Sequence, residues 1–164
     1  MLKRIGILVF LVFSTTVIAS TPRTEINLQW MKSNYSIIQQ KLRHDDSILV
    51  VPTINTLGEI WLHRDGAVSG EVSSLLLVAL THHTHISLAV LSSEPDSFLK
   101  WLNELQGIVF TDFNGGEVEQ LSQTKEDVVR ALNSYMNSNP QVLLVPYGKS
   151  LLERLEGITI RSVD

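Results

Sequence analysis

The 164-residue chain contains no cysteine. That absence excludes a disulfide framework, a thiolate zinc site, a cysteine nucleophile and a lipid-modified N-terminal cysteine. Charged residues make up only 18% of the chain, aromatic residues make up 7%, and the formal net charge is −4. This acidic balance does not match the basic surface that nucleic-acid binding requires. Composition therefore favours one compact domain that folds without cross-links and does not bind nucleic acid directly.

The N-terminus has the layout of an export signal. Lys3 and Arg4 precede an apolar run over residues 5–19, which is shorter than the roughly 20 residues that span a bilayer. Residues 1–20 are therefore predicted to be a signal peptide or a membrane anchor. Both interpretations place residues 21–164 outside the cytoplasm, as a single domain in the bacterial periplasm or facing it from the inner membrane.

Residues 86–113 predict a strand, a helix and a strand in direct succession. Residues 86–91 and 108–113 are short apolar runs that favour strands. Gly107 is expected to end the intervening helix in the left-handed conformation. The apolar face of that helix consists of Phe98, Leu99, Leu102 and Leu105. Such a tight succession predicts a right-handed βαβ crossover.

The rest of the body is predicted to alternate in the same way. Residues 47–54 and 59–63 read as two strands of a hairpin. Helices are expected over residues 24–43, 71–81, 125–137 and 149–156, and further strands over residues 142–145 and 158–163. The predicted fold class is α/β, a two-layer sandwich whose mixed sheet contains βαβ units, after one N-terminal hydrophobic segment.

A weak internal repeat accompanies this alternation. The residues Leu102, Leu105, Gly107 and Ile108 recur as Leu152, Leu155, Gly157 and Ile158, at an offset of 50 positions. Any leucine-rich helix that ends at a glycine before a strand gives such a match, so chance is favoured over duplication.

His82, His83 and His85 form the most unusual cluster of the sequence. The simplest interpretation is a polar helix end, where such side chains complement the helix dipole. A second hypothesis is that the three imidazoles titrate together near pH 6, with the acidic body favouring their protonated form. Metal ligation ranks third, since adjacent imidazoles point about 100° apart on a helix. Trp101 lies off the leucine face of its helix and is either a partner contact or a core residue.

The sequence predicts no catalytic residue, cofactor or metal site. Paired carboxylates at positions 45–46, 94/96 and 117/119 lie at expected turns or helix starts, where acids are favoured for other reasons. Asn114-Gly115-Gly116 matches no phosphate-loop pattern. These observations predict a non-enzymatic protein.

Residues 48–113 resemble the periplasmic domain of ExbD/TolR proteins. The resemblance rests on a hairpin containing Glu-Ile-Trp-Leu-His at 59–63, then Val68-Ser69 before a helix, then the βαβ unit. It implies an envelope binding module. The essential membrane aspartate of that family has no counterpart in residues 5–19.

The layout of the whole chain is similar to that of MyfF/PsaF-like accessory partners of ToxR-type membrane activators. The shared features are a charged tip, one apolar N-terminal segment and a small periplasmic body. This resemblance implies a protein that binds and stabilises a single-pass membrane transcription activator of fimbrial or virulence genes and relays envelope conditions such as pH. We take it as the leading hypothesis, an ExbD/TolR-type binding module as the alternative, and a small periplasmic enzyme as the third.

Overall fold

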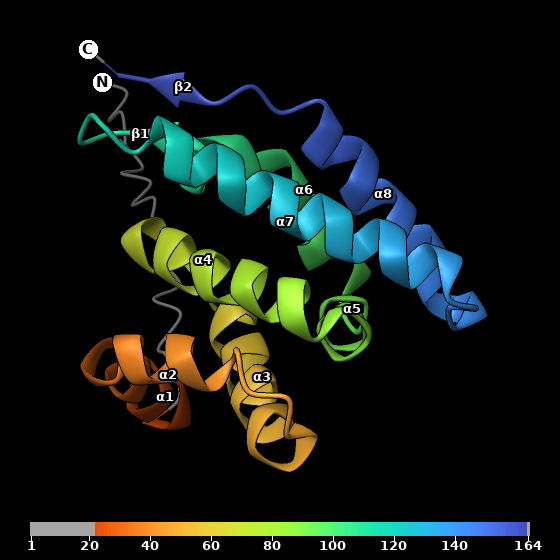
Figure 1. Cartoon of the computed structure of the whole chain (residues 1–164). Coiled ribbons are helices and arrows are strands. Elements are labelled where there is room, and N and C mark those ends of the chain that lie inside the picture. The colour runs from red at the N-terminus through yellow and green to blue at the C-terminus, as the bar shows by residue number, and fades with distance from the viewer. Residues whose placement is uncertain (1–21, 164) are drawn as a thin grey trace, which may run out of the picture.

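The computed structural model describes residues 22–163, and this part of the chain is mostly helical (Figure 1). The elements in chain order are α1 (Pro22–Ser33), α2 (Tyr35–Lys41), α3 (Ser47–Leu62), α4 (Gly66–His82), α5 (Thr84–Leu91), α6 (Pro95–Ile108), β1 (Thr111–Asp112), α7 (Val118–Asn137), the 3₁₀ turn η1 (Val142–Leu144), α8 (Val145–Glu156) and β2 (Arg161–Ser162). The predicted α/β sandwich is wrong, because within these residues the sheet consists of β1 and β2 alone.

The predicted export segment, residues 1–20, lies outside the described residues. Among the helices that are described, none is both long enough and apolar enough to cross a membrane.

Helix α4 is the centre of the fold. It crosses the molecule between α1–α3 on one side and α6–α8 on the other, and it packs against α3, α5, α6 and α7 (Figure 1). Its buried apolar side chains are Val72, Leu75, Leu76, Leu77, Ala79 and Leu80. Since neighbours cover most of its circumference, α4 needs apolar residues nearly all round and lacks a polar face.

The predicted hairpin over residues 47–63 is a single helix, α3. The Asp46 carboxylate caps its N-terminus by accepting a hydrogen bond from the backbone N–H of Ile48, at 2.9 Å. Its main buried positions recur at helical spacing and are Val50, Ile54, Leu57 and Trp61. Pro52 lies inside the helix and does not end it.

The predicted βαβ unit of residues 86–113 is also wrong. Its first strand is α5, a helix that buries Ser87, Leu88 and Leu91. The central helix is confirmed as α6, but Gly107 lies within α6 and does not adopt a positive φ. Only Thr111 and Asp112 of the second run form a strand.

The C-terminal half follows the prediction more closely. The helices expected over residues 71–81, 125–137 and 149–156 are confirmed within α4, α7 and α8, and Gly157 is the C-cap of α8. The expected strand over residues 142–145 is instead a 3₁₀ turn followed by the start of α8. The last strand is confirmed only in part, as β2, which pairs in parallel with β1.

Candidate functional site

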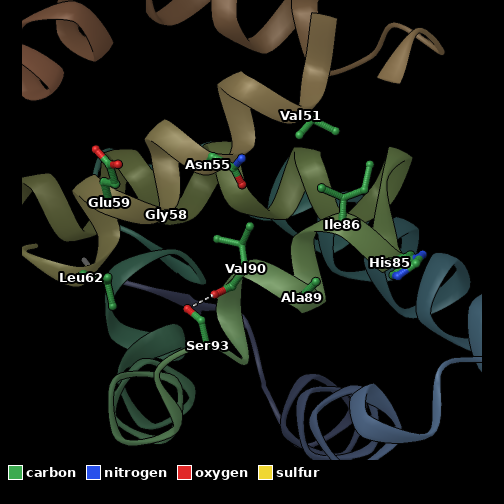
Figure 2. A pocket seen from close by; sticks show the side chains of 10 residues that line it. All are labelled: Val51, Asn55, Gly58, Glu59, Leu62, His85, Ile86, Ala89, Val90 and Ser93. Atoms are coloured by element: carbon green, nitrogen blue, oxygen red, sulfur yellow. Dashed lines mark hydrogen bonds between the residues drawn. The ribbon is translucent and has the colours of Figure 1, made fainter. Parts of the chain in front are cut away.

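A groove runs along the outer surface between α3 and α5. It encloses about 680 Å³ and is lined by Val51, Asn55, Gly58, Glu59, Leu62, His85, Ile86, Ala89, Val90 and Ser93 (Figure 2). The walls are mostly apolar, and the polar groups stand at the sides. We call this hollow the α3/α5 groove.

The floor of the α3/α5 groove is the contact between Gly58 and Val90. A Cβ atom added at Gly58 would overlap Cγ1 of Val90, so the two helices approach too closely for any side chain at position 58. Ile86 lies one turn before Val90 on the same face of α5 and lines the groove beside this contact.

The polar groups of the α3/α5 groove are largely occupied. Glu59 accepts hydrogen bonds from Arg23 Nη2 and Asn27 Nδ2 of α1, each at 2.8 Å. Ser93 Oγ donates to the backbone carbonyl of Val90 at 2.7 Å (Figure 2). Asn55 is exposed, and its amide forms no hydrogen bond with another described residue.

The three predicted histidines meet at the corner between α4 and α5, opposite α7. They line a second hollow of about 390 Å³ with Tyr135 and the neighbouring Ser134, and we call it the histidine corner. The ring of His85 stacks on Tyr135 with a centroid distance of 6.0 Å and an interplanar angle of 21°. His85 also lines the α3/α5 groove, so the two hollows share a wall.

The environments of the three histidines differ. His82 is exposed at the end of α4, yet partial burial and the positive charges of Arg43 and His83 lower its pKa. The carboxylates of Asp45 and Asp127 act in the expected direction on His82, but burial and these positive charges outweigh them. His83 caps the junction of the two helices, and its Nε2 is buried without a hydrogen-bond partner. Within residues 22–163 no set of three histidine, aspartate or glutamate side chains is arranged to hold a metal ion.

Trp101 lies in the core, away from both hollows. It is completely buried, its indole Nε1 donates to Ser73 Oγ at 2.9 Å, and its ring meets Trp61 edge to face at 6.2 Å. Of the two interpretations of Trp101, its complete burial supports the core residue.

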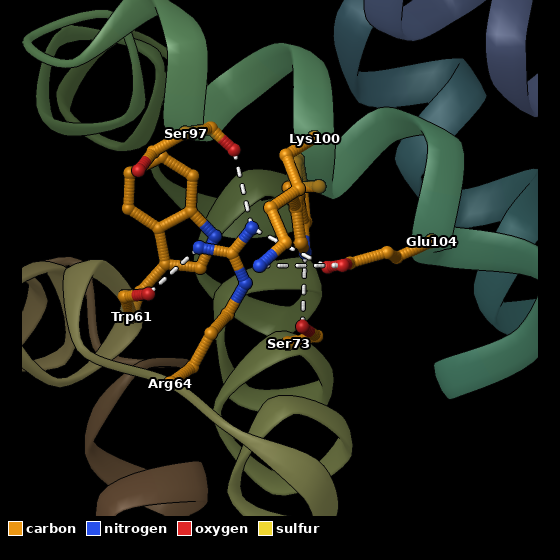
Figure 3. Close-up of polar contacts among 7 residues, drawn as sticks. Trp61, Arg64, Ser73, Ser97, Lys100 and Glu104 are labelled. Carbon is orange, nitrogen blue, oxygen red and sulfur yellow. Dashed lines mark hydrogen bonds and ion pairs between the residues drawn. The ribbon is translucent and has the colours of Figure 1, made fainter. Parts of the chain in front are cut away.

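Arg64 is the centre of a polar cluster that the sequence patterns did not predict (Figure 3). The Arg64 side chain is only 4% exposed and lies over the ring of Trp61, 4.8 Å from the ring centroid. Its guanidinium donates to the backbone carbonyls of Trp61 and Ser97 and lies 3.5 Å from Glu104. Burial lowers the pKa of Arg64, and the Glu104 carboxylate opposes that shift. The cluster joins the end of α3 to α6 and has a structural role.

Asp112 is a second buried polar residue that the sequence patterns did not single out. Its side chain is fully buried and accepts hydrogen bonds from the backbone N–H groups of Asn114, Gly115 and Glu117. The hydrogen bond from the backbone N–H of Glu117 contributes most to lowering the pKa of Asp112, and the hydrogen bonds from the glycine loop lower it further. An aspartate two residues before Asn-Gly-Gly is a recognisable turn signal. This signal marks a loop that leads into α7, not a reactive site.

The strands behind the ExbD/TolR resemblance are mostly helices, because the expected hairpin is α3 and the expected first strand of the βαβ unit is α5. Comparison with protein-family models, with curated proteins and with solved structures finds no match to this chain. The α3/α5 groove and the histidine corner are therefore the features that bear on its function.

Proposed function

We propose that this chain is a non-enzymatic accessory protein of the bacterial envelope that binds a membrane-bound transcription activator through the α3/α5 groove. The observation that carries the proposal is the groove itself, an open apolar channel of about 680 Å³ between two helices. That volume lies within the range of roughly 300–1,000 Å³ that is usual for binding pockets.

The chemistry of the groove supports binding more than reaction. The Glu59 carboxylate is engaged by two donors from α1, and the Ser93 hydroxyl is engaged by a backbone carbonyl. A nucleophile or general base needs a neighbour that activates it, and neither group contacts a histidine through a hydrogen bond. The apolar walls offer burial of a partner's side chains as the main source of affinity.

The form of the partner follows from the walls. Strand addition requires a free strand edge, whereas both walls of this groove are helices. A short amphipathic helix that places apolar side chains at i and i+4 into the channel is the mode that fits. Asn55, whose amide has no described partner, is available to bind one backbone or side-chain group of that helix. We assign this helix to the periplasmic part of a single-pass activator, as the layout of the chain suggests.

The proposal is tested by cross-linking in intact cells. A photo-reactive amino acid replaces Ala89, which is exposed in the groove, or Ala67, which is exposed on the first turn of α4 outside it. We expect a single-pass membrane activator to be captured from position 89 and not from position 67. Equal capture from both positions, or capture of soluble proteins alone, would contradict the proposal.

A charge in the groove gives an independent readout. Ala89→Glu should weaken binding of the captured activator's periplasmic part by tenfold or more, on the order of the cost of burying an unpaired carboxylate. The matched Ala67→Glu variant should bind normally, and both variants should keep the wild-type thermal midpoint because both positions are exposed.

A further inference from the structure

We infer that the histidine corner binds a small oxyanion, of the sulfate or phosphate type, and takes up protons as it does so. This site is separate from the helix-binding role of the α3/α5 groove, and its test uses the protein without any partner. The hollow of about 390 Å³ has room for such an ion with several waters.

The donors in the hollow are the first support. The imidazoles of His82, His83 and His85 line it. The hydroxyl of Ser134 lines the same hollow and forms no hydrogen bond with another described residue. Tyr135 lines the hollow as well, and its phenol oxygen accepts a hydrogen bond from the backbone N–H of Gln141 at 3.2 Å.

The backbone adds a second contribution. Helix α5 begins in this hollow without a side-chain cap. The N–H of Ser87 donates to the carbonyl of His83, so the N–H groups of the residues between them lie in the first turn and have no carbonyl of α5 to bind. Unpaired N–H groups at a helix start favour an anion. Helices α4 and α7, however, end at the same hollow and present carbonyl groups that disfavour one. The backbone contributions oppose one another, so the charge on the imidazoles decides whether an anion binds.

The surroundings of His82 oppose its protonation. Burial lowers the pKa of His82, and so do the positive charges of Arg43 and His83, whereas Asp45 and Asp127 act in the opposite direction. An uncomplexed protein therefore resists protonation of His82. An oxyanion in this hollow would compensate the new charge, so proton uptake and anion binding must favour each other.

This linkage predicts a measurable pH dependence. For one required proton on a histidine with the ordinary pKa of about 6.5, the anion should bind about eightfold more tightly at pH 6.0 than at pH 7.5. If His82 takes up the proton, the ratio of the affinity at pH 6.0 to that at pH 7.5 should exceed eightfold, because the pKa of His82 is lowered.

The experiment follows the imidazole resonances of the full chain by NMR while sodium sulfate is added at pH 6.0 and at pH 7.5. Sulfate keeps its charge over this range, and sodium chloride at equal ionic strength is the control for screening. We expect saturable shifts at the three corner histidines, no saturable shift at His44 or His63, and tighter binding at pH 6.0. His85→Gln should weaken binding by about threefold to tenfold, because one charge-assisted contact at an exposed position is lost, and His63→Gln should leave it unchanged.

Three results would overturn the inference: no saturable shift, equal shifts at all five histidines, or the same affinity at both pH values. All three are read from the wild-type chain and do not depend on how a variant folds. Failure of sulfate binding would leave cross-linking from Ala89 unaffected, so the two proposals are tested separately.

Discussion

Gly58 of α3 and Val90 of α5 lie so close together that the absence of a side chain at position 58 is a condition of the fold. Gly58→Ala inserts a methyl group against a stiff, β-branched neighbour. We expect overpacking to outweigh the gain in helix propensity and to lower the free energy of unfolding by about 1–2 kcal/mol. Urea denaturation measures the change.

Gly107 provides the matched control for Gly58. It is also helical, but it is exposed and a Cβ atom there would contact nothing within 4 Å. Gly107→Ala should therefore raise the free energy of unfolding by about 0.5–1 kcal/mol, through propensity alone. If both alanine variants were stabilised, the close contact between α3 and α5 would be wrong.

The hydrogen bond between Trp101 and Ser73 gives a second prediction. Both side chains are fully buried, so Ser73→Ala should leave the indole N–H without a partner and cost about 1–3 kcal/mol. Trp101→Phe removes the donor as well as part of the packing. In a double-mutant cycle monitored by denaturation, the two substitutions together should cost less than the sum of the single effects. Additive effects would show that the hydrogen bond is not formed.

Arg64 and Lys100 share the carboxylate of Glu104 but differ in burial. Arg64 is 4% exposed and holds two backbone carbonyls, whereas Lys100 is 67% exposed. Arg64→Ala should cost about 1–3 kcal/mol, because hydrogen bonds from a charged donor to buried acceptors are lost. Lys100→Ala should cost less than about 0.5 kcal/mol, as is usual for a surface ion pair. Similar thermal midpoints for the two variants would contradict the described position of Arg64.

Asp112 predicts the response to acid. Its pKa is lower in the folded state than in the unfolded chain, so its contribution to stability is present above pH 4 and is lost as the pH falls below this value. Asp112→Asn should destabilise the protein at neutral pH, since an amide nitrogen replaces one oxygen that accepts from backbone N–H groups. The same variant should lose less stability than wild type between pH 5 and pH 2. A wild-type and a variant pH profile of equal slope would exclude this role.

The location of the body is predicted by Lys3 and Arg4 together with the apolar run over residues 5–19. Alkaline phosphatase fused after Asp164 should be active, because the enzyme folds only outside the cytoplasm, and mass determination of the mature N-terminus should distinguish signal from anchor. A stable but inactive fusion would place the body in the cytoplasm.

The parallel pairing of β1 with β2 joins Thr111 to Arg161 and Asp112 to Ser162, an offset of 50 positions. The weak repeat in the sequence has the same offset. Each strand follows a helix, α6 or α8, and Arg154 of α8 donates to the backbone carbonyls of Leu102 and Asn103 in α6. The repeat thus corresponds to two helix–strand units whose strands pair with each other.

The sequence by itself determined most of the three amphipathic helices, although the starts of α7 and α8 lie before the predicted ranges of 125–137 and 149–156. In α6, α7 and α8, apolar residues recur on one face and polar residues occupy the other, so the 3.6-residue period is visible without knowledge of the neighbours. Pro95 at the start of α6 and Gly157 at the end of α8 act in the same local way, since their effects on the backbone do not depend on the neighbours.

Only the tertiary structure decided the nature of α3 and α5, the two walls of the groove. Their runs are apolar on several sides and rich in Val and Ile, and periodicity cannot distinguish a buried helix from a buried strand in such a run. Helices α3 and α5 pack against α4 and against each other, so several faces of each are buried. A helix suits such a position because it satisfies its own backbone hydrogen bonds. The histidine pattern was visible in the sequence, but the hollow that it lines is formed with α7, about fifty residues later in the chain.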